Sequence, residues 1–195
     1  DAKEVLSALT PLVNAADHHA WMERFREANK LEYEKVIQHA WFPQSPKLLM
    51  GEVIHELAKH TNGEAILVTD VGQHQMVASR YYPFKNPRTN VTSGGAGTMG
   101  FALPASLGAK MSQPQKQVVA VIGDGGFQMT LQELGTIMQY NIPVKIVLLN
   151  NNFLGMVRQW QQLFFEKRYS FTELKNPDFV TLTKAYGIEA AKVTE

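Results

Sequence analysis

The chain of 195 residues contains no cysteine, which excludes disulfide frameworks and thiolate metal sites. It also has no apolar run near the roughly 20 residues that span a bilayer, so we expect no membrane segment. Its 19 Lys and Arg residues nearly balance 18 Asp and Glu residues, giving a net charge of +1. This balance gives no electrostatic reason to expect nucleic acid or an anionic membrane as a partner. Hydrophobic residues make up 45% of the chain, which is enough for a sizeable core.

Two polar clusters, each at the end of an apolar run, are the most informative feature that is present. Gly123-Asp124-Gly125-Gly126 follows the run Val118–Ile122, and Asn150-Asn151 follows the run Val144–Leu149. Both runs are typical of buried parallel strands. A carboxylate and a carboxamide are therefore expected at the same edge of one sheet. Such oxygens suit Mg²⁺, and the glycines allow backbone N–H groups to approach a phosphate.

Strands and helices alternate from Ser45 onward, which predicts an α/β fold: a doubly wound, mostly parallel sheet with helices on both faces. The expected strands are residues 65–69, 117–122 and 145–149, with a short extended piece near Asn90. The expected helices are residues 98–111, 129–140, 155–164 and 177–186, together with one capped by Ser45 that ends near Asn62. Ligands in such sheets bind outside the carboxyl ends of the strands, where the glycine-rich loops lie.

The N-terminal part has a different pattern. Residues 1–16 predict a short helix, and Asp17 is placed to cap a second helix that runs to about Ala40. The sequence Phe42-Pro43-Gln44 then interrupts the helical pattern. We therefore interpret residues 1–44 as a linker with helices and residues 45–195 as the α/β domain.

Four further segments extend the GDG…NN pattern, and together they resemble one family. GDG followed by NN is similar to the cofactor signature of thiamine diphosphate (ThDP) enzymes. The additional segments resemble the large catalytic subunit of acetolactate synthase (acetohydroxyacid synthase); they are Val71–Met76, Thr92–Gly100, Gly155–Trp160 and Leu163–Ser170. The resemblance implies that residues 45–195 are the ThDP diphosphate- and Mg²⁺-binding domain, truncated at its C-terminus. Residues 1–44 would come from the preceding central domain.

The resemblance also implies the metal ligands. Asp124 and Asn151 would bind Mg²⁺ through their side chains, and Phe153 would bind it through its backbone carbonyl. From the residues alone, Asp124 is equally compatible with a helix N-cap between two glycines, and Asn151 with an ordinary polar residue at a strand end.

Further positions are assigned to the cofactor or the substrate by the same resemblance. Met99 would support the bent cofactor, and Met156 and Trp160 would line the substrate entrance, although helical spacing alone suggests core packing for both. Gln73 and His74 would contact the diphosphate; a lone histidine is more often structural. The full cofactor-binding set is Gln73, His74, Gly97, Met99, Gly123, Asp124, Gly125, Gly126, Asn151, Gly155 and Met156.

For the whole protein, the resemblance implies condensation of two pyruvates, or of pyruvate and 2-oxobutyrate, with loss of CO₂ in branched-chain amino-acid biosynthesis. The activating glutamate would lie on a missing N-terminal domain of a partner subunit, so we expect no catalytic residue and no turnover in this chain alone. FAD would bind only the full-length enzyme. A homodimer or homotetramer, with a small regulatory subunit, is expected in the bacterial cytoplasm, or in a plastid or mitochondrion of a eukaryote.

Three alternatives remain open at this point. The domain could belong to another ThDP enzyme, such as a pyruvate oxidase, a glyoxylate carboligase or a 2-oxo acid decarboxylase. It could be a non-catalytic interaction module. Residues Gly95–Gly100 also fit the dinucleotide pattern G-x-G-x-x-G. The polar segment before Gly95 and the lack of a suitable acidic residue at the end of a second strand argue against NAD.

Overall fold

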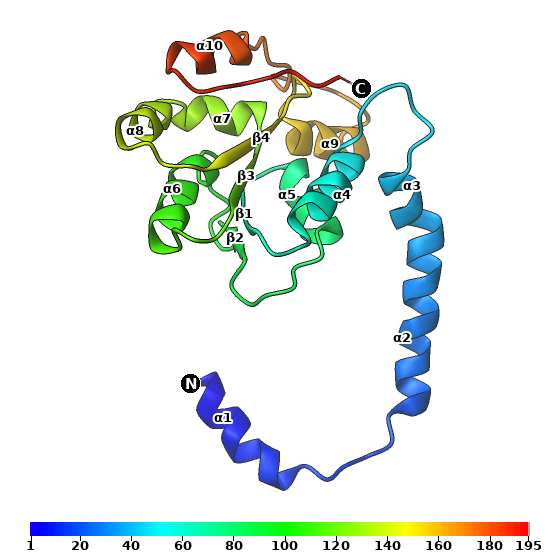
Figure 1. Ribbon diagram of the computed structural model, residues 1–195. Helices are drawn as coiled ribbons and strands as arrows, with labels where there is room; N and C mark the ends of the chain where they lie inside the picture. Colours follow the sequence, from blue (N-terminus) through cyan, green and yellow to red (C-terminus); the bar gives the residue numbers. More distant parts are fainter. Residues whose placement is uncertain (195) are drawn as a thin grey trace. The chain divides into compact units, whose positions relative to one another are not determined.

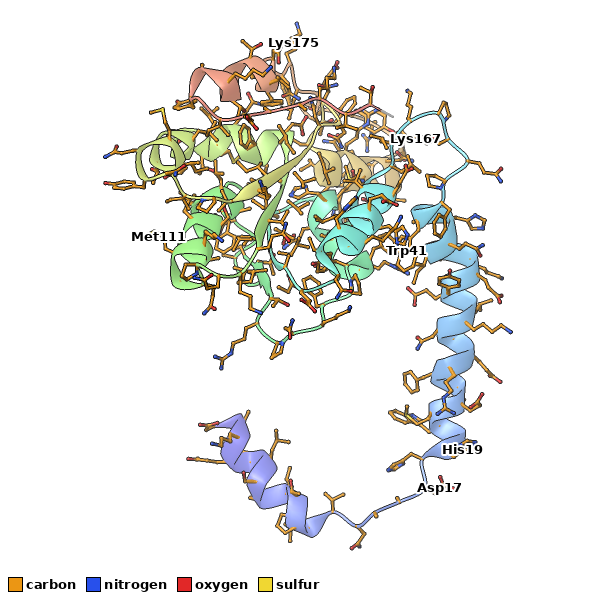
Figure 2. The ribbon with its side chains drawn as sticks, viewed as in Figure 1. Asp17, His19, Trp41, Met111, Lys167 and Lys175 are labelled. Atoms are coloured by element: carbon orange, nitrogen blue, oxygen red, sulfur yellow. The ribbon has the colours of Figure 1, made fainter. Side chains whose placement is uncertain are left out.

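A computed structural model describes residues 1–194 and divides into two compact units, Asp1–His39 and a second unit from Ala40 onward (Figure 1). The first unit holds α1 (Ala2–Leu9), η1 (Thr10–Leu12), α2 (His19–Glu32) and the π-helical turn η2 (Tyr33–Ile37). Asp17 accepts a hydrogen bond from the backbone N–H of His19 at 2.8 Å, at the start of α2 (Figure 2). The expected helix after Asp17 is confirmed, and its pattern continues through η2 into α3 (Gln38–Trp41).

The second unit is built on a four-stranded parallel sheet with the order β2-β1-β3-β4. The strands are β1 (Ile66–Thr69), β2 (Asn90–Thr92), β3 (Val118–Gly123) and β4 (Lys145–Leu149). Every residue of β1 and β3 is buried, as expected for central strands that are covered on both faces. Because all four strands are parallel, their carboxyl ends lie at one edge of the sheet.

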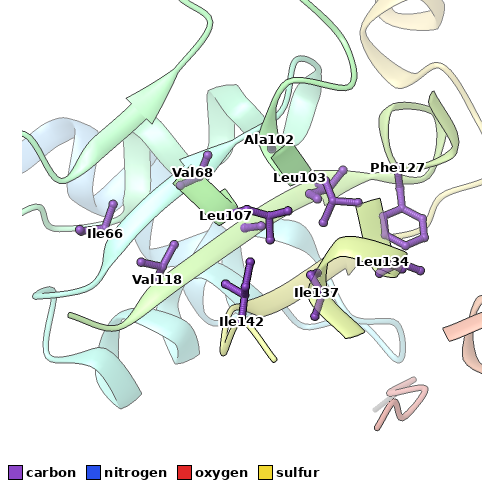
Figure 3. Packing of buried hydrophobic residues seen from close by; sticks show 12 residues of the cluster. Ile66, Val68, Ala102, Leu103, Leu107, Val118, Phe127, Leu134, Ile137 and Ile142 are labelled. Carbon is purple, nitrogen blue, oxygen red and sulfur yellow. The ribbon is translucent and has the colours of Figure 1, made fainter. Parts of the chain in front are cut away.

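Alternate residues of the central strands face two separate cores. Ile66 and Val68 pack with buried side chains of α6 (Ala102–Ser112), α7 (Asp124–Thr130) and α8 (Glu133–Tyr140) (Figure 3). Leu67, on the opposite face, packs with α4 (Met50–Thr61) and α5 (Gln73–Tyr81). Figure 1 shows these two groups of helices on opposite sides of the strands. The doubly wound α/β prediction is therefore confirmed.

Two helices complete the unit, and their positions match the sequence closely. Helix α9 spans Gly155–Phe164, and α10 spans Phe179–Ala185. Asp178 caps α10 by accepting hydrogen bonds from the backbone N–H groups of Val180 and Thr181. Across residues 1–194, no helix combines the length and the apolarity that a membrane span requires.

Three predicted helix starts are wrong. Ser45 accepts a bond from the Lys47 N–H in a local turn, and α4 begins later, at Met50. Helix α6 begins at Ala102 rather than Thr98, because the preceding residues form a loop with positive φ at Gly97 and Gly100. The helix expected from Met129 begins at Asp124 instead and is interrupted before α8. The GDGG segment is therefore the start of a helix as well as a loop.

Candidate functional site

A pocket of about 50 Å³ lies at the carboxyl ends of β1, β3 and β4. Its lining comes from the segments after β1, before α6, after β3 and after β4, and from Met50 at the start of α4. Val71, Leu154 and Met50 belong to this lining although the sequence reasoning assigned no role to them. The predicted residues that line it are Gln73, His74, Met99, Gly123, Asp124, Gly125, Gly126, Asn151, Phe153, Gly155 and Met156. Gly97 and Trp160 are not part of its lining.

Asp124 is the carboxylate of this pocket. It is 2% exposed and is the first residue of α7, directly after β3. Its Oδ2 accepts the backbone N–H of Asn152 at 2.8 Å, and its Oδ1 accepts its neighbour's N–H, that of Gly125, at 3.1 Å. Helix N-termini favour negative charge, so the position stabilises a buried carboxylate. The N-cap of α7 is Gly123, so Asp124 is not the cap that the sequence also allowed, and it lines the pocket as the first helical residue.

Asn151 and Phe153 come from the loop between β4 and α9. The Phe153 N–H donates to Asn151 Oδ1 at 3.0 Å, which fixes the side chain of Asn151 within its own loop. The loop is held from outside by an antiparallel bridge between Phe153 and Glu173. The backbone N–H of Leu154 donates to Thr172 O, and that of Leu174 donates to Asn152 O, both at 2.8 Å. A segment beyond α9 thus fixes the loop.

His74 is the buried histidine of the site. It lies in the first turn of α5 and is 5% exposed, and its Nε2 has no hydrogen-bond partner among residues 1–194. Burial lowers the pKa of His74, against the opposing effects of the Asp70 and Asp124 charges and of a hydrogen bond to the Asp70 backbone. An orphaned buried polar atom beside a pocket requires a partner, which a bound ligand would supply.

At four glycines of this region, a neighbouring side chain occupies the space that a Cβ would need. A Cβ on Gly123 would lie 2.9 Å from the His74 ring, and a Cβ on Gly125 would lie 2.8 Å from Leu154 Cδ2. A Cβ on Gly155 would collide with Gln73 Oε1, and one on Gly126 would collide with the Asp70 carboxylate. Any side chain at these positions would therefore fill or distort the pocket.

Asp70 organises the loop that carries Met99, and the sequence reasoning missed it. It is fully buried at the end of β1, and its two oxygens accept the N–H groups of Gly100 at 3.0 Å and Ala102 at 2.9 Å. This anchors the start of α6 and places Met99 at the pocket. Met99 is close to Gly125, since a Cβ on Gly125 would lie 3.6 Å from Met99 Cε.

The two residues assigned to the substrate entrance separate along α9. Met156 lines the pocket in the first turn. Trp160, one turn further, is 56% exposed and stacks on Phe164 with ring centroids 4.9 Å apart. Gln73 joins this helix to α5 through a hydrogen bond from its Nε2 to Gln159 Oε1 at 2.9 Å. Gly97 lies in the exposed loop before Met99 with φ of 62°.

A second missed residue, Asn176, lies beyond α9. Its side-chain Nδ2 is 2.6 Å from Asp124 Oδ2. No spacing rule connects an isolated Asn-Pro pair to a residue so far away in the sequence. The one signal near Asn176 in the sequence is the cluster of turn-forming residues around Pro177, which indicates a turn.

The donor chemistry fits a hard cation beside an anion. Asp124, Asn151 and Phe153 line the pocket, and these residues carry a carboxylate, a side-chain amide oxygen and a backbone carbonyl. Oxygen ligands of this type suit Mg²⁺, which takes its remaining ligands from water and phosphate. Among residues 1–194, no group of three or more His, Asp or Glu side chains is arranged to hold a metal. A site rich in carboxylates or imidazoles is therefore not found in the described part of the chain.

Comparison with known proteins identifies the family. Residues 70–195 match the model of the thiamine pyrophosphate enzyme, C-terminal TPP binding domain. The chain is 46% identical, over 99% of its length, to the acetolactate synthase large subunit of Lactococcus lactis, and 44% identical, over 96%, to the isozyme 3 large subunit of Escherichia coli. The mitochondrial catalytic subunit of Saccharomyces cerevisiae is 44% identical over 88% of the chain. The chain spans 33% of each bacterial relative and 25% of the yeast one.

The resemblance drawn from the sequence is therefore confirmed, with thiamine pyrophosphate (ThDP) as the cofactor of the matched domain. The matched region includes every predicted site residue from Gln73 to Trp160. The chain belongs to the thiamine pyrophosphate enzymes, carries their C-terminal cofactor-binding domain, and is homologous to acetolactate synthase large subunits.

Proposed function

We propose that this chain holds the diphosphate end of ThDP through Mg²⁺ at the pocket around Asp124. The observation that carries the proposal is the convergence of the Asp124 carboxylate, the Asn151 amide and the unpartnered His74 Nε2 on one pocket at the carboxyl edge of the sheet. The first two supply oxygen ligands for the metal. Gly123, Gly125, Gly126 and Gly155 leave the space that the neighbouring side chains of this pocket occupy.

The other side chains that the sequence assigned to the site also have roles in this proposal. The Phe153 carbonyl completes the protein ligands, and Gln73 and His74 contact the diphosphate. Met99 is an adaptable apolar contact for the rings of the cofactor. Met156, at the start of α9, and Trp160, one turn further, flank the approach of the substrate.

In this proposal, His74 changes its protonation state when the cofactor binds. Burial lowers its pKa, so the ring is neutral near pH 7 in the free chain. A nearby diphosphate favours the charged form of the ring, because opposite charges attract in a poorly solvated site. We therefore expect binding of the diphosphate to be accompanied by proton uptake at Nε2.

For the whole protein, we propose the acetolactate synthase reaction. When bound, ThDP supplies the electron sink that decarboxylation of pyruvate requires. The product then arises by joining the remaining two-carbon unit to a second 2-oxo acid, either pyruvate or 2-oxobutyrate, in branched-chain amino-acid biosynthesis. This assignment follows the relatives, whose names specify acetolactate synthase.

Other features of the whole protein are also proposals. The activating glutamate and the FAD site belong to other domains, so this chain alone is inactive. The active assembly is a homodimer or homotetramer, with a small regulatory subunit. A bacterial protein of this kind works in the cytoplasm, and a eukaryotic one in a plastid or mitochondrion.

Thermal unfolding tests the binding site directly. ThDP with Mg²⁺ at about 100 times the Kd should stabilise the chain by roughly 2.7 kcal/mol. For a chain of this size the Tm should rise by about 2–4 °C per kcal/mol. EDTA and Asp124→Ala should each abolish the rise. Asp17→Ala is the matched control, because Asp17 also accepts a backbone N–H but lies outside the pocket.

The same experiment separates the enzyme domain from a non-catalytic module of the same fold. A cooperative unfolding transition that does not move with ThDP and Mg²⁺ would contradict the proposal and favour the module. A rise that persists in Asp124→Ala would show binding at another place.

A further inference from the structure

The side-chain nitrogen of Asn176 contacts three oxygens at the proposed metal site. Asn176 Nδ2 lies 2.6 Å from Asp124 Oδ2, 2.9 Å from Asn150 Oδ1 and 3.1 Å from Asn152 Oδ1. Asn150 and Asn152 flank the predicted metal ligand Asn151 on both sides in the sequence. Among the described residues, Asn176 is thus the one side chain that forms hydrogen bonds both to Asp124 and to the two neighbours of Asn151.

Gln128 fixes which way this amide faces. Its Nε2 donates to Asn176 Oδ1 at 2.9 Å, so the Asn176 oxygen is occupied and its nitrogen must point toward Asp124. Gln128 lies one turn after Asp124 on α7, and the same Nε2 is 3.4 Å from the Asp124 carbonyl oxygen. The contact therefore consists of an ordered chain of donors, from Gln128 to Asn176 to the carboxylate.

The backbone that presents Asn176 is also held in place. Thr172 is 3% exposed, and its carbonyl accepts the Leu154 N–H, while the Leu174 N–H donates to Asn152 O. These bonds place the segment antiparallel to the loop after β4. Asn176 is half-buried two residues beyond this pairing, whereas its neighbour Lys175 is exposed and points outward (Figure 2).

The two oxygens of the Asp124 carboxylate receive different numbers of hydrogen-bond donors. Oδ2 receives two donors, the Asn152 N–H and Asn176 Nδ2, whereas Oδ1 receives, within the described residues, only the adjacent Gly125 N–H. Each carboxylate oxygen has two lone-pair sites. Oδ1 is therefore the oxygen that keeps a site for a cation, and the two donors on Oδ2 fix the plane of the group.

We propose that Asn176 is a positioning residue that orients the Asp124 carboxylate and the Asn150–Asn152 turn for Mg²⁺. The proposal rests on the proposed function of the pocket. Partners that orient metal ligands commonly contribute 10- to 100-fold to metal affinity. Asn176 itself contacts neither metal nor substrate in this role.

The test measures Mg²⁺ affinity by titration at saturating ThDP, following the Tm and the tryptophan fluorescence of the full 195-residue chain. Asn176→Ala should weaken Mg²⁺ binding by about 10-fold or more, and Gln128→Ala should weaken it less. The double variant should resemble Asn176→Ala, because Gln128 acts through Asn176. Asn86→Ala is the matched control, since Asn86 is also followed by proline but is exposed.

A role in overall stability alone predicts a different pattern. Asn176→Ala would then lower the Tm without ThDP and leave the Mg²⁺ affinity within twofold of the parent chain, and this result would overturn the proposal. Losses of affinity in Gln128→Ala and Asn176→Ala that add fully in the double variant would overturn the ordered chain of donors.

A second measurement keeps the two proposals separate. If the parent chain shows no response to ThDP and Mg²⁺, the proposed function fails for this chain. Urea unfolding of the ligand-free Asn176→Ala, Asp124→Ala and double variants then decides whether Asn176 holds Asp124. A double variant that unfolds at nearly the same urea concentration as the weaker single variant supports the contact, and fully additive losses overturn it.

Discussion

The imidazole ring of His74 lies directly against the backbone of Gly123, where a Cβ would be 2.9 Å from two ring atoms. The backbone of Gly123 has φ of −83°, so alanine is sterically allowed there apart from this contact. The last residue of β3 is thus glycine because His74, in the first turn of α5, occupies the space that a side chain would need.

Gly123→Ala should therefore destabilise the chain by about 1–3 kcal/mol through overpacking, and it should displace His74 from the pocket. Urea unfolding measures the first effect. Gly108→Ala is the control, because a Cβ there meets no atom within 4 Å and Gly108 lies within α6. Gly108→Ala should raise the free energy of unfolding by about 0.5–1 kcal/mol. Equal stability of Gly123→Ala and the parent chain would contradict the close contact.

The buried His74 predicts how stability depends on pH. Its folded pKa lies below the ordinary value of 6.5, so the unfolded chain binds a proton that the folded chain does not bind. This contribution to stability is complete above the unfolded pKa and is lost as the pH falls toward the folded pKa. The Tm of the ligand-free chain should fall as the pH drops below the ordinary histidine pKa of 6.5.

His74→Asn should make that part of the Tm profile shallower, whereas His60→Asn should not, because His60 is exposed. The comparison uses the slopes of the profiles, since His74→Asn also changes packing at every pH. Parallel slopes for the parent chain and His74→Asn would show that another group causes the pH dependence.

The conservative change Asp70→Asn should have a large effect on the stability of the chain. Its two oxygens accept the N–H groups of Gly100 and Ala102 inside the protein. Asp70→Asn replaces one acceptor with an NH₂ group that faces an N–H donor, so the free energy of unfolding should fall by about 1–3 kcal/mol. Chemical denaturation measures this loss. Asp178→Asn is the control, since asparagine caps a helix as well as aspartate does, and a similar loss in both variants would argue against a special role for Asp70.

Arg158 predicts a local effect near the pocket. Its guanidinium lies over the rings of Phe153 at 4.2 Å and Tyr169 at 4.0 Å, and so joins the loop after β4 to the segment beyond α9. Each such contact is worth about 0.5–1 kcal/mol at exposed sites. Arg158→Met should therefore increase hydrogen exchange at the Leu154 and Leu174 amides about fivefold or more.

Lys175→Met is the matched control for this measurement, because it also removes a positive charge from the same region and Lys175 is exposed. It should leave both amides at the exchange rate of the parent chain. Unchanged exchange in Arg158→Met would mean that the backbone pairing alone holds the two segments together.

The parallel sheet was readable from the sequence because its signal is local. The apolar runs of β3 and β4 and the amphipathic pattern of α9 lie within single segments, and β4 and α9 begin and end where predicted. The start of α4 was wrong because a serine followed by proline can close a turn as readily as it caps a helix.

The site was only partly readable for the opposite reason. Asp124 and the Asn150-Asn151 pair follow recognisable strands, and the family resemblance added Gln73, His74, Met99 and the glycines. Asp70 and Asn176 act through contacts 30 and 52 residues away, to Gly100 and Asp124 respectively. Neither residue belongs to a periodic pattern, so only the fold brings each to its partner.

The pairing of the loop after β4 with the segment beyond α9 also has a consequence during synthesis. Chains emerge from the ribosome N-terminus first, and the strands from β1 to β4 can associate as soon as Leu149 is free. The bonds of Thr172, Leu174 and Asn176 to this loop form only after that later segment has been made. The nascent sheet therefore precedes a finished pocket, and a chain interrupted within α9 would have the scaffold without the bonds that hold the pocket in shape.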